Sequence, residues 1–268
     1  MKYLALSDLD NTLLTWNKEI TNESINYIRD WVSKGNIFCI STGRPYAGAY
    51  QFYQVLGVNC PLVCDNGCSI YFLDGKNKFF TIEMNRFKEF LSRTKGMDSH
   101  IYIITSKNVS YTHHLDKVPS WIIHNEMNNL EIIDGDIVKN LKEEPLICNF
   151  WLKERFLDEF MNIIKDYEDI FFYQNWGLYD GIYSFEIHSK FASKGIALKY
   201  LKDYYKIDDD KTLAFGDELN DISMILEAHY GVSMINGNQE LKAKTIYHTD
   251  YDYNNNGVIE FLKKLEND

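Results

Sequence analysis

Two carboxylates follow a short apolar run near the N-terminus, and this pattern constrains the fold more than any other part of the chain. Residues 3–6 form the run, and Asp8 and Asp10 come just after it. A short apolar run bounded by polar residues predicts a buried strand. In open α/β sheets, ligands bind beyond the carboxyl ends of such strands. Because two close carboxylates repel unless a cation or a proton lies between them, we expect a metal-assisted nucleophile beside an acid/base here.

Composition limits the classes of protein that the chain can belong to. The 268 residues are 45% apolar, which is typical of a globular protein with a sizeable core and room for two domains. A net charge of -11 argues against a nucleic-acid surface, which needs a basic patch. Residues 1–3 lead directly into the first strand without a signal-peptide pattern, and no apolar run approaches a membrane span. We therefore expect a cytoplasmic protein with no membrane or nucleic-acid partner, either a monomer or a weak homo-oligomer.

The cysteines invite a metal-binding interpretation that we do not adopt. Their number is five, which is odd, so a disulfide framework is not expected in this chain. Cys60, Cys64 and Cys68 are evenly spaced, but the CxxC spacing of zinc sites is absent. Cys64 ends an apolar run and Cys68 follows a turn pair, so we interpret both as small core residues.

Strands and helices alternate at both ends of the chain, which predicts a parallel sheet. The expected strands of these parts are residues 3–6, 36–40, 61–64, 212–215 and 230–234. The expected helices are residues 21–34, 46–56, 193–205 and about 222–228. A hairpin is expected to join residues 69–72 to residues 79–82. The middle of the chain differs, with strands expected at 101–104, 171–173 and 183–187 and a helix at 156–167. We therefore predict an α/β core, residues 1–82 and 187–268, interrupted by an α+β domain at 83–186.

Four groups of polar residues follow the predicted strands or begin a helix, where a parallel sheet would gather them. The groups are Asp8 with Asp10, Thr42 with Gly43, Lys194, and Asp217 with Asn220 and Asp221. Each has an ordinary explanation alone, as a turn, a helix cap or a solvated charge. Together, the carboxylates suit a hard cation such as Mg²⁺, which prefers oxygen ligands and a substrate phosphate.

The remaining groups suit a phosphate ester. The Thr42 hydroxyl and neighbouring backbone N–H groups can hold phosphate oxygens, and Lys194 adds a positive charge. Asp8 can then attack phosphorus to form an aspartyl-phosphate, while Asp10 protonates the leaving oxygen and later activates water. In phosphoryl transfer, most of the catalysis is positioning and charge stabilisation, which these residues supply.

At this point the chain resembles a haloacid dehalogenase superfamily phosphatase of the Cof type with a C2-type (type IIB) cap. The four motifs are residues 8–12 (DLDNT), 40–45 (ISTGRP), 193–195 (SKG) and 216–221 (GDELND), and residues 65–67, 231–236 and 256–258 agree as well. The resemblance implies a Rossmann-like parallel-sheet core with an inserted cap. Two departures are modest: Asn11 stands where many relatives carry glycine, and Gly237 where alanine is common.

The same resemblance implies roles for individual residues. Asp8 would be the nucleophile and Asp10 the acid/base. Mg²⁺ would be held by the Asp8 carboxylate, the Asp10 backbone carbonyl and Asp217, with Asp221 nearby, often through water. Phosphate would be contacted by Thr42, the adjoining Gly43, Lys194 and Asn220.

The substrate remains open at this stage. The family acts on many small phosphorylated metabolites, with sugar phosphates prominent. Candidates for selectivity in the middle domain and at its end are Arg86, Arg93, His113, His114, Trp121, His124, Trp176, His188 and Lys190, each of which also has an ordinary structural interpretation. A phosphatase is our first hypothesis. A sugar phosphomutase and a catalytically idle phosphometabolite-binding regulator are the alternatives.

Overall fold

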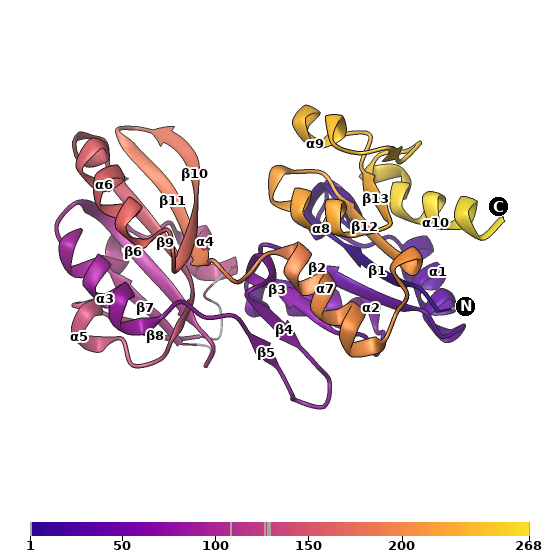
Figure 1. The fold of residues 1–268 in the computed structure, drawn as a ribbon, viewed down its shortest axis with the longest axis horizontal. Helices are drawn as coiled ribbons and strands as arrows, with labels where there is room; N and C mark the ends of the chain where they lie inside the picture. Colours follow the sequence, from indigo (N-terminus) through magenta and orange to yellow (C-terminus); the bar gives the residue numbers. More distant parts are fainter. Residues whose placement is uncertain (1, 108, 126, 128–129, 268) are drawn as a thin grey trace. The chain divides into compact units, whose positions relative to one another are not determined.

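The computed structural model describes residues 2–107, 109–125, 127 and 130–267. The chain forms two compact units: Met1–Lys78 together with Ser193–Asp268 make the first, and Phe79–Ala192 the second. Each has its own sheet (Figure 1). The unit boundaries lie at 78/79 and 192/193, where the sequence suggested 82/83 and 186/187.

The elements of the first unit come from both ends of the chain. Its strands are β1 (Leu4–Ser7), β2 (Ile37–Ser41), β3 (Leu62–Cys64), β4 (Ser69–Tyr71), β5 (Lys78–Phe79), β12 (Thr212–Gly216), β13 (Tyr230–Ser233) and β14 (Tyr247–His248). Its helices are α1 (Asn22–Ser33), α2 (Tyr46–Leu56), α7 (Lys194–Tyr205), α8 (Ile222–Glu227), α9 (Gln239–Ala243) and α10 (Gly257–Asn267).

The sheet of the first unit has the order β14-β13-β12-β1-β2-β3-β4-β5. β1 pairs in parallel with both β12 and β2, and every residue of these three strands is buried. Parallel strands covered on both faces are apolar throughout, which explains the short continuous apolar runs of the sequence. The chain builds β2 and β3 on one side of β1 and returns to build β12 and β13 on the other. This reversal of strand order places a ligand crevice at the carboxyl end of β1.

The second unit has an α+β architecture. Its elements are α3 (Met84–Arg93), β6 (Asp98–Thr105), β7 (Val109–His113), α4 (Ser120–Asn125), β8 (Glu131–Asp134), α5 (Ile137–Asn140), β9 (Pro145–Lys153), α6 (Leu157–Ile164), β10 (Phe171–Tyr179) and β11 (Ile182–Ser189). The sheet order is β10-β11-β9-β6-β7-β8, antiparallel except for β7 and β8. One core contains Phe87 and Phe90 of α3, Phe160 of α6 and Phe150 of β9. A smaller one contains Tyr102, Ile122 and Ile147.

The α/β class expected from the sequence is confirmed, and most core elements begin and end near their predicted residues. The hairpin is shorter than predicted, because β5 ends at Phe79 while residues 79–82 had been assigned to a strand. The Ile82 backbone N–H donates to the Pro145 carbonyl oxygen at 2.8 Å, so the chain has already joined the second unit there. All five cysteines are free thiols and buried. None of the helices in the described ranges combines the length and apolar character that a membrane span requires.

Candidate active site

Asp8 lies at the carboxyl end of the central strand. Its backbone N–H donates to the Phe215 carbonyl oxygen of β12 at 2.9 Å, which continues the ladder one residue beyond β1. The side chain is nearly buried. The turn that follows, Leu9–Leu13, contains Asn11 with a φ of 54°. Asn tolerates this left-handed conformation better than most residues other than glycine, which explains why glycine and Asn are both suitable at this position.

Lys194 connects two of the carboxylates. Its Nζ atom donates to Asp8 Oδ1 and to Asp221 Oδ1, both at 2.6 Å, and its side chain is fully buried. Lys194 opens α7, and the hydroxyl of the preceding Ser193 caps the helix by accepting from the Ile196 N–H. The cap fixes the start of the helix, and so the direction from which Lys194 enters the site.

Asp217 and Asp221 follow β12. Both Asp221 oxygens are engaged, since Oδ1 accepts from Lys194 and Oδ2 accepts from the backbone N–H groups of Asp217 and Glu218. Asp217 Oδ1 accepts from the Thr12 hydroxyl at 3.0 Å. Asp221 therefore organises the loop, while Asp8 and Asp217 keep oxygen atoms with fewer contacts.

The buried cluster of Asp8, Asp217, Asp221 and Lys194 contains more carboxylates than cations. Burial raises the pKa of Asp8; Lys194 opposes the rise and Asp221 adds to it. Burial also raises the pKa of Asp217 to about 6, again with a contribution from Asp221. For Lys194, burial lowers the pKa, but the attraction of Asp221 and Asp8 outweighs it and the net shift is upward. One ammonium thus faces three carboxylates.

The donor set fits a hard divalent cation. The carboxylate oxygens of Asp8, Asp217 and Asp221 lie within 4.8 Å of one another, and all three residues are buried. Mg²⁺ takes carboxylate oxygens in preference to nitrogen or sulfur ligands. A cation at this place would also compensate the excess of negative charge.

Thr42 and Gly43 follow β2 on one side of β1. Thr42 is buried, and its hydroxyl accepts from the Arg44 backbone N–H at 3.1 Å. Asn66 comes close to Gly43, because a Cβ placed there would lie only 3.1 Å from Asn66 Oδ1. The same Asn66 oxygen accepts from Asn220 Nδ2 at 2.9 Å. Asn66 therefore joins the loops after β2, β3 and β12, a connection that the sequence analysis did not assign to the site.

Asp10 has different partners from those of Asp8. Arg44 holds its carboxylate with two bonds, Nε to Oδ2 at 2.7 Å and Nη2 to Oδ1 at 2.8 Å, and Lys18 Nζ adds a third at 2.8 Å. Burial favours the neutral acid, but the hydrogen bonds from Arg44 and Lys18 outweigh it and lower the pKa of Asp10 to about 2. In this conformation Asp10 is a paired carboxylate and not a proton donor.

Gly67 allows Lys194 to reach the site. Its φ is +91°, and a Cβ there would lie 2.2 Å from the Ser193 carbonyl oxygen and 2.9 Å from the Lys194 backbone nitrogen. No side chain fits between these backbones, so only glycine lets the loop after β3 pack against the start of α7. Residues 65–67 agree with the family resemblance, and the contact with α7 gives Gly67 a structural role that the sequence analysis did not assign.

The candidates in the second unit have varied surroundings. Arg86 is paired with Asp169 and Arg93 with Asp166, so both cations are already neutralised. Trp121 and Trp176 are 58% and 50% exposed. His113 contacts Asp98, and Lys190 donates to the Glu168 carbonyl oxygen.

Fold and site together define an α/β protein with a buried acidic centre at the carboxyl end of its central strand. A sequence profile described as haloacid dehalogenase-like hydrolase matches residues 5–262. The chain therefore belongs to the haloacid dehalogenase-like hydrolases, as the motif resemblance predicted.

Named relatives and solved structures extend over nearly the whole chain. The Bacillus subtilis 5-amino-6-(5-phospho-D-ribitylamino)uracil phosphatase YitU is 27% identical and covers 98% of this chain and 97% of its own. The Escherichia coli pyridoxal phosphate phosphatase YbhA is 25% identical, with coverage of 88% and 89%. The crystal structure of TM0651 from Thermotoga maritima superposes with a TM-score of 0.82 at 22% identity, covering 98% and 97%. This last similarity establishes the shared fold.

Proposed function

We propose that the protein is a Mg²⁺-dependent phosphatase that hydrolyses small phosphorylated metabolites, sugar phosphates above all, through an aspartyl-phosphate on Asp8. The observation that carries this proposal is the fully buried Lys194, which bridges Asp8 and Asp221 at 2.6 Å each. The Lys194 ammonium beside Asp8, at the carboxyl end of β1, reduces the repulsion between the Asp8 carboxylate and an anionic phosphate. The phosphatase names of the relatives support the same reaction.

In the first step an Asp8 carboxylate oxygen attacks phosphorus, and the bond from phosphorus to the leaving oxygen breaks. Asp10 gives its proton to that oxygen. Thr42, Gly43, Lys194 and Asn220 hold the phosphate oxygens as charge develops. The leaving alcohol then departs with the proton of Asp10.

In the second step a water molecule attacks the phosphorus of the aspartyl-phosphate. Asp10 takes the proton of the water, inorganic phosphate leaves, and the Asp8 carboxylate is restored. Mg²⁺ would be held by Asp8, the Asp10 backbone carbonyl, Asp217 and Asp221. The bound ion supplies positive charge that offsets the charge of the phosphate and of the carboxylates.

The acid role requires Asp10 to leave Arg44. With its pKa lowered to about 2 by Arg44 and Lys18, Asp10 keeps no proton at neutral pH. We propose that substrate binding draws Arg44 and Lys18 toward the phosphate ester. Burial and the negative charge of the phosphate then raise the pKa of the released Asp10, so that it takes up a proton from water before it acts as the acid. The Arg44–Asp10 pair is then the arrangement of the site before substrate binds.

We assign substrate selectivity to residues 83–186, as a cap. Lids of this kind exclude water and choose the leaving group. Because YitU and YbhA are named for a ribitylaminouracil phosphate and for pyridoxal phosphate, heterocyclic phosphates belong beside sugar phosphates among the candidates. A cytoplasmic location and a monomeric or weakly associating chain stay predictions.

The test is phosphate release from a panel of sugar phosphates, nucleotides, pyridoxal phosphate and 5-amino-6-(5-phospho-D-ribitylamino)uracil, with Mg²⁺ and with EDTA. We expect Mg²⁺-dependent release that Asp8→Asn abolishes. Asp10→Asn should slow release by about 10² or more, the usual contribution of an acid/base. The matched control is Asp74→Asn, in an exposed turn where Asp74 forms an ion pair with Lys76.

Three results would contradict the proposal. Near-native turnover by Asp8→Asn would remove the nucleophile. Transfer of labelled phosphate to an isomeric sugar, with none released to water, would make the protein a mutase. Ligand binding without turnover of any ester would make it a regulator.

A further inference from the structure

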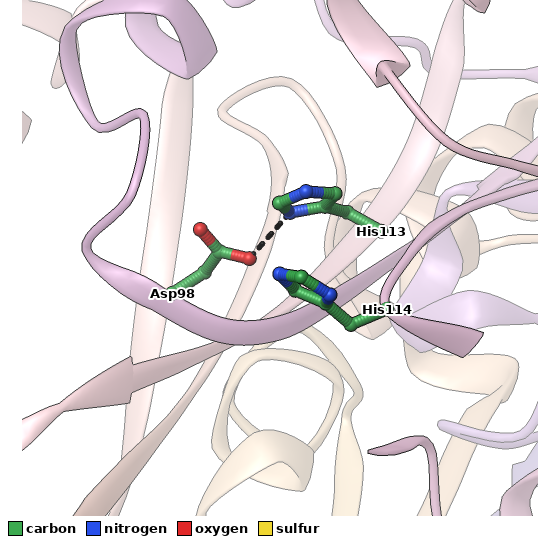
Figure 2. Close-up of side chains that lie close together, drawn as sticks. All are labelled: Asp98, His113 and His114. Carbon is green, nitrogen blue, oxygen red and sulfur yellow. Dashed lines mark hydrogen bonds and ion pairs between the residues drawn. The ribbon is translucent and has the colours of Figure 1, made fainter. Parts of the chain in front are cut away.

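A second group of potential metal ligands lies within Phe79–Ala192, on elements that contribute none of the groups proposed to react with the phosphate (Figure 2). Asp98 begins β6, and His113 ends the neighbouring β7. The Asp98 side chain is only 3% exposed, and its Oδ2 lies 2.6 Å from His113 Nδ1. A carboxylate so deeply buried requires a donor or a cation.

His114 joins the pair because of its backbone conformation. Consecutive side chains of a strand point to opposite faces, so two adjacent histidines on a strand would ordinarily be separated. His114 has a φ of 63°, in the left-handed region, as the chain turns into the residues Leu115–Lys117. This brings its ring to 3.9 Å from the His113 ring, centroid to centroid. Figure 2 shows both rings facing the Asp98 carboxylate.

The three side chains offer one ligand atom each within a small volume. One carboxylate oxygen of Asp98 and one ring nitrogen each of His113 and His114 all lie within 4.8 Å of one another. Two imidazoles with one carboxylate suit a first-row divalent ion, whereas Mg²⁺ and Ca²⁺ favour oxygen ligands throughout. Structural and catalytic zinc sites use the same ligand types.

A cavity beside the cluster leaves room for further ligands. Its volume is about 280 Å³, and Asp98 and His113 contribute to its wall together with Thr94, Lys95 and Asp136. A zinc ion held by three protein ligands completes its coordination with water or an exogenous group. The cavity supplies the space that such a fourth ligand occupies.

We propose that Asp98, His113 and His114 form a binding site for a divalent transition-metal ion, with Zn²⁺ the best fit. The ion replaces the Asp98–His113 hydrogen bond, because the Asp98 oxygen and the His113 nitrogen turn toward the metal. The site is independent of the phosphatase proposal, since none of its residues belongs to the reacting groups.

The experiment measures Zn²⁺ binding to the full chain by competition with a chromophoric chelator, with metal content confirmed after dialysis. We expect His114→Asn to weaken binding at this site by at least about tenfold, a loss at the scale known for altered metal surroundings. Asn accepts a positive φ, so this variant removes the imidazole while keeping the backbone. Asp98→Asn is the second variant, and it should cause a similar loss.

The matched control is His124→Asn, which makes the same chemical change at an exposed histidine of the same unit. Asp217→Asn identifies any Zn²⁺ held by the acidic cluster of the other unit. The Co²⁺-loaded chain gives an independent readout, since its visible spectrum reports nitrogen ligands and should change in His114→Asn alone among these histidine variants.

Three outcomes would overturn the proposal. Zn²⁺ binding that His114→Asn and Asp98→Asn leave unchanged would show that the cluster is an ordinary hydrogen-bonded network. Zn²⁺ binding lost only in Asp217→Asn would place all bound metal at the acidic cluster. Absence of Zn²⁺ binding to the wild-type chain would show that Asp98, His113 and His114 hold no metal ion. Thermal melts of each variant without metal exclude loss of fold as the cause.

Discussion

At the scale of single residues, the site depends on charged groups that are buried and therefore compensated by one another and not by water. Lys194 is fully buried, and its two carboxylate partners, Asp8 and Asp221, are buried as well. Breaking a buried ion pair by removing one partner is far more costly than losing a surface pair, about 3–5 kcal/mol, because a charge is left without compensation. The same contacts that position Asp8 therefore also contribute to the stability of the core.

Gly67 is predicted to be intolerant of any side chain. Gly67→Ala would put a Cβ 2.2 Å from the Ser193 carbonyl oxygen, in addition to the strain of a positive φ. We expect a loss of unfolding free energy above the 1–3 kcal/mol typical of backbone strain, and reduced phosphatase activity because Lys194 shifts. Urea unfolding followed by circular dichroism measures the first and phosphate release the second.

Gly75→Ala is the control for this prediction. Gly75 also has a positive φ, +77°, but nothing lies within 4 Å of the Cβ position. This variant should show the strain alone, with activity intact. Equal effects of the two variants would mean that the contact with Ser193 is unimportant.

The sequence predicts which candidate side chains the fold brings together better than it predicts their partners. Asp8, Thr42, Lys194 and Asp217 stand in motifs, since each chemistry needs a particular residue type at a particular strand end. The bridge made by Asn66 depends on three loops meeting in space, and no local pattern encodes that meeting. The Arg44–Asp10 pair is likewise a property of the folded chain.

At the scale of elements, the candidate site residues follow strands or begin a helix, and the Ser193 cap fixes where the helix that carries Lys194 begins. The limits of α2 could be predicted because a proline precedes it and Gly57, with a φ of 64°, ends it. The middle of the chain was harder, and β7, β8 and β9 were not predicted. β9 begins with a proline, and β8 is only half-buried, so neither shows the clean alternation that identifies a strand.

A histidine on β11 should make stability depend on pH. Burial lowers the pKa of His188 below its ordinary value of 6.5. The folded chain therefore disfavours the proton that the unfolded chain accepts, and stability falls as the pH drops below about 6.5. We expect the free energy of unfolding of the wild type, relative to His188→Gln, to decrease between pH 7.5 and pH 5.5, about one unit either side of that pKa.

Urea unfolding at a series of pH values measures this difference. Subtracting the variant removes the titration of all other groups that the two chains share. A difference that is constant with pH would show that His188 has the same proton affinity in the folded and unfolded chains.

At the scale of the whole molecule, an acidic protein with a net charge of -11 must bind an anionic substrate. The carboxylates of Asp8, Asp217 and Asp221 add to the electrostatic repulsion of that substrate unless a cation binds among them. We predict that Mg²⁺ raises the melting temperature of the chain, since a ligand that binds only the folded state stabilises it. At a concentration of 100 times the dissociation constant, the gain is about 2.7 kcal/mol.

Calorimetry with Mg²⁺ and with EDTA checks this prediction. Asp217→Asn should lose the Mg²⁺-dependent increase. Asp250→Asn, an exposed carboxylate of the same unit that pairs with Lys264, should keep it. An equal increase in both variants would place the ion elsewhere.

The discontinuity of the first unit has a consequence for how the protein is made. Asp8 meets Lys194 across 186 positions of sequence, and Thr12 meets Asp217 across 205. On the ribosome β1 emerges early, yet its neighbour β12 appears only after all of Phe79–Ala192 has been translated. Until then one side of the central strand has no partner, and such unpaired edges aggregate. We therefore expect the nascent chain to be most prone to aggregation while Phe79–Ala192 is being synthesised, which is when a chaperone would protect it most.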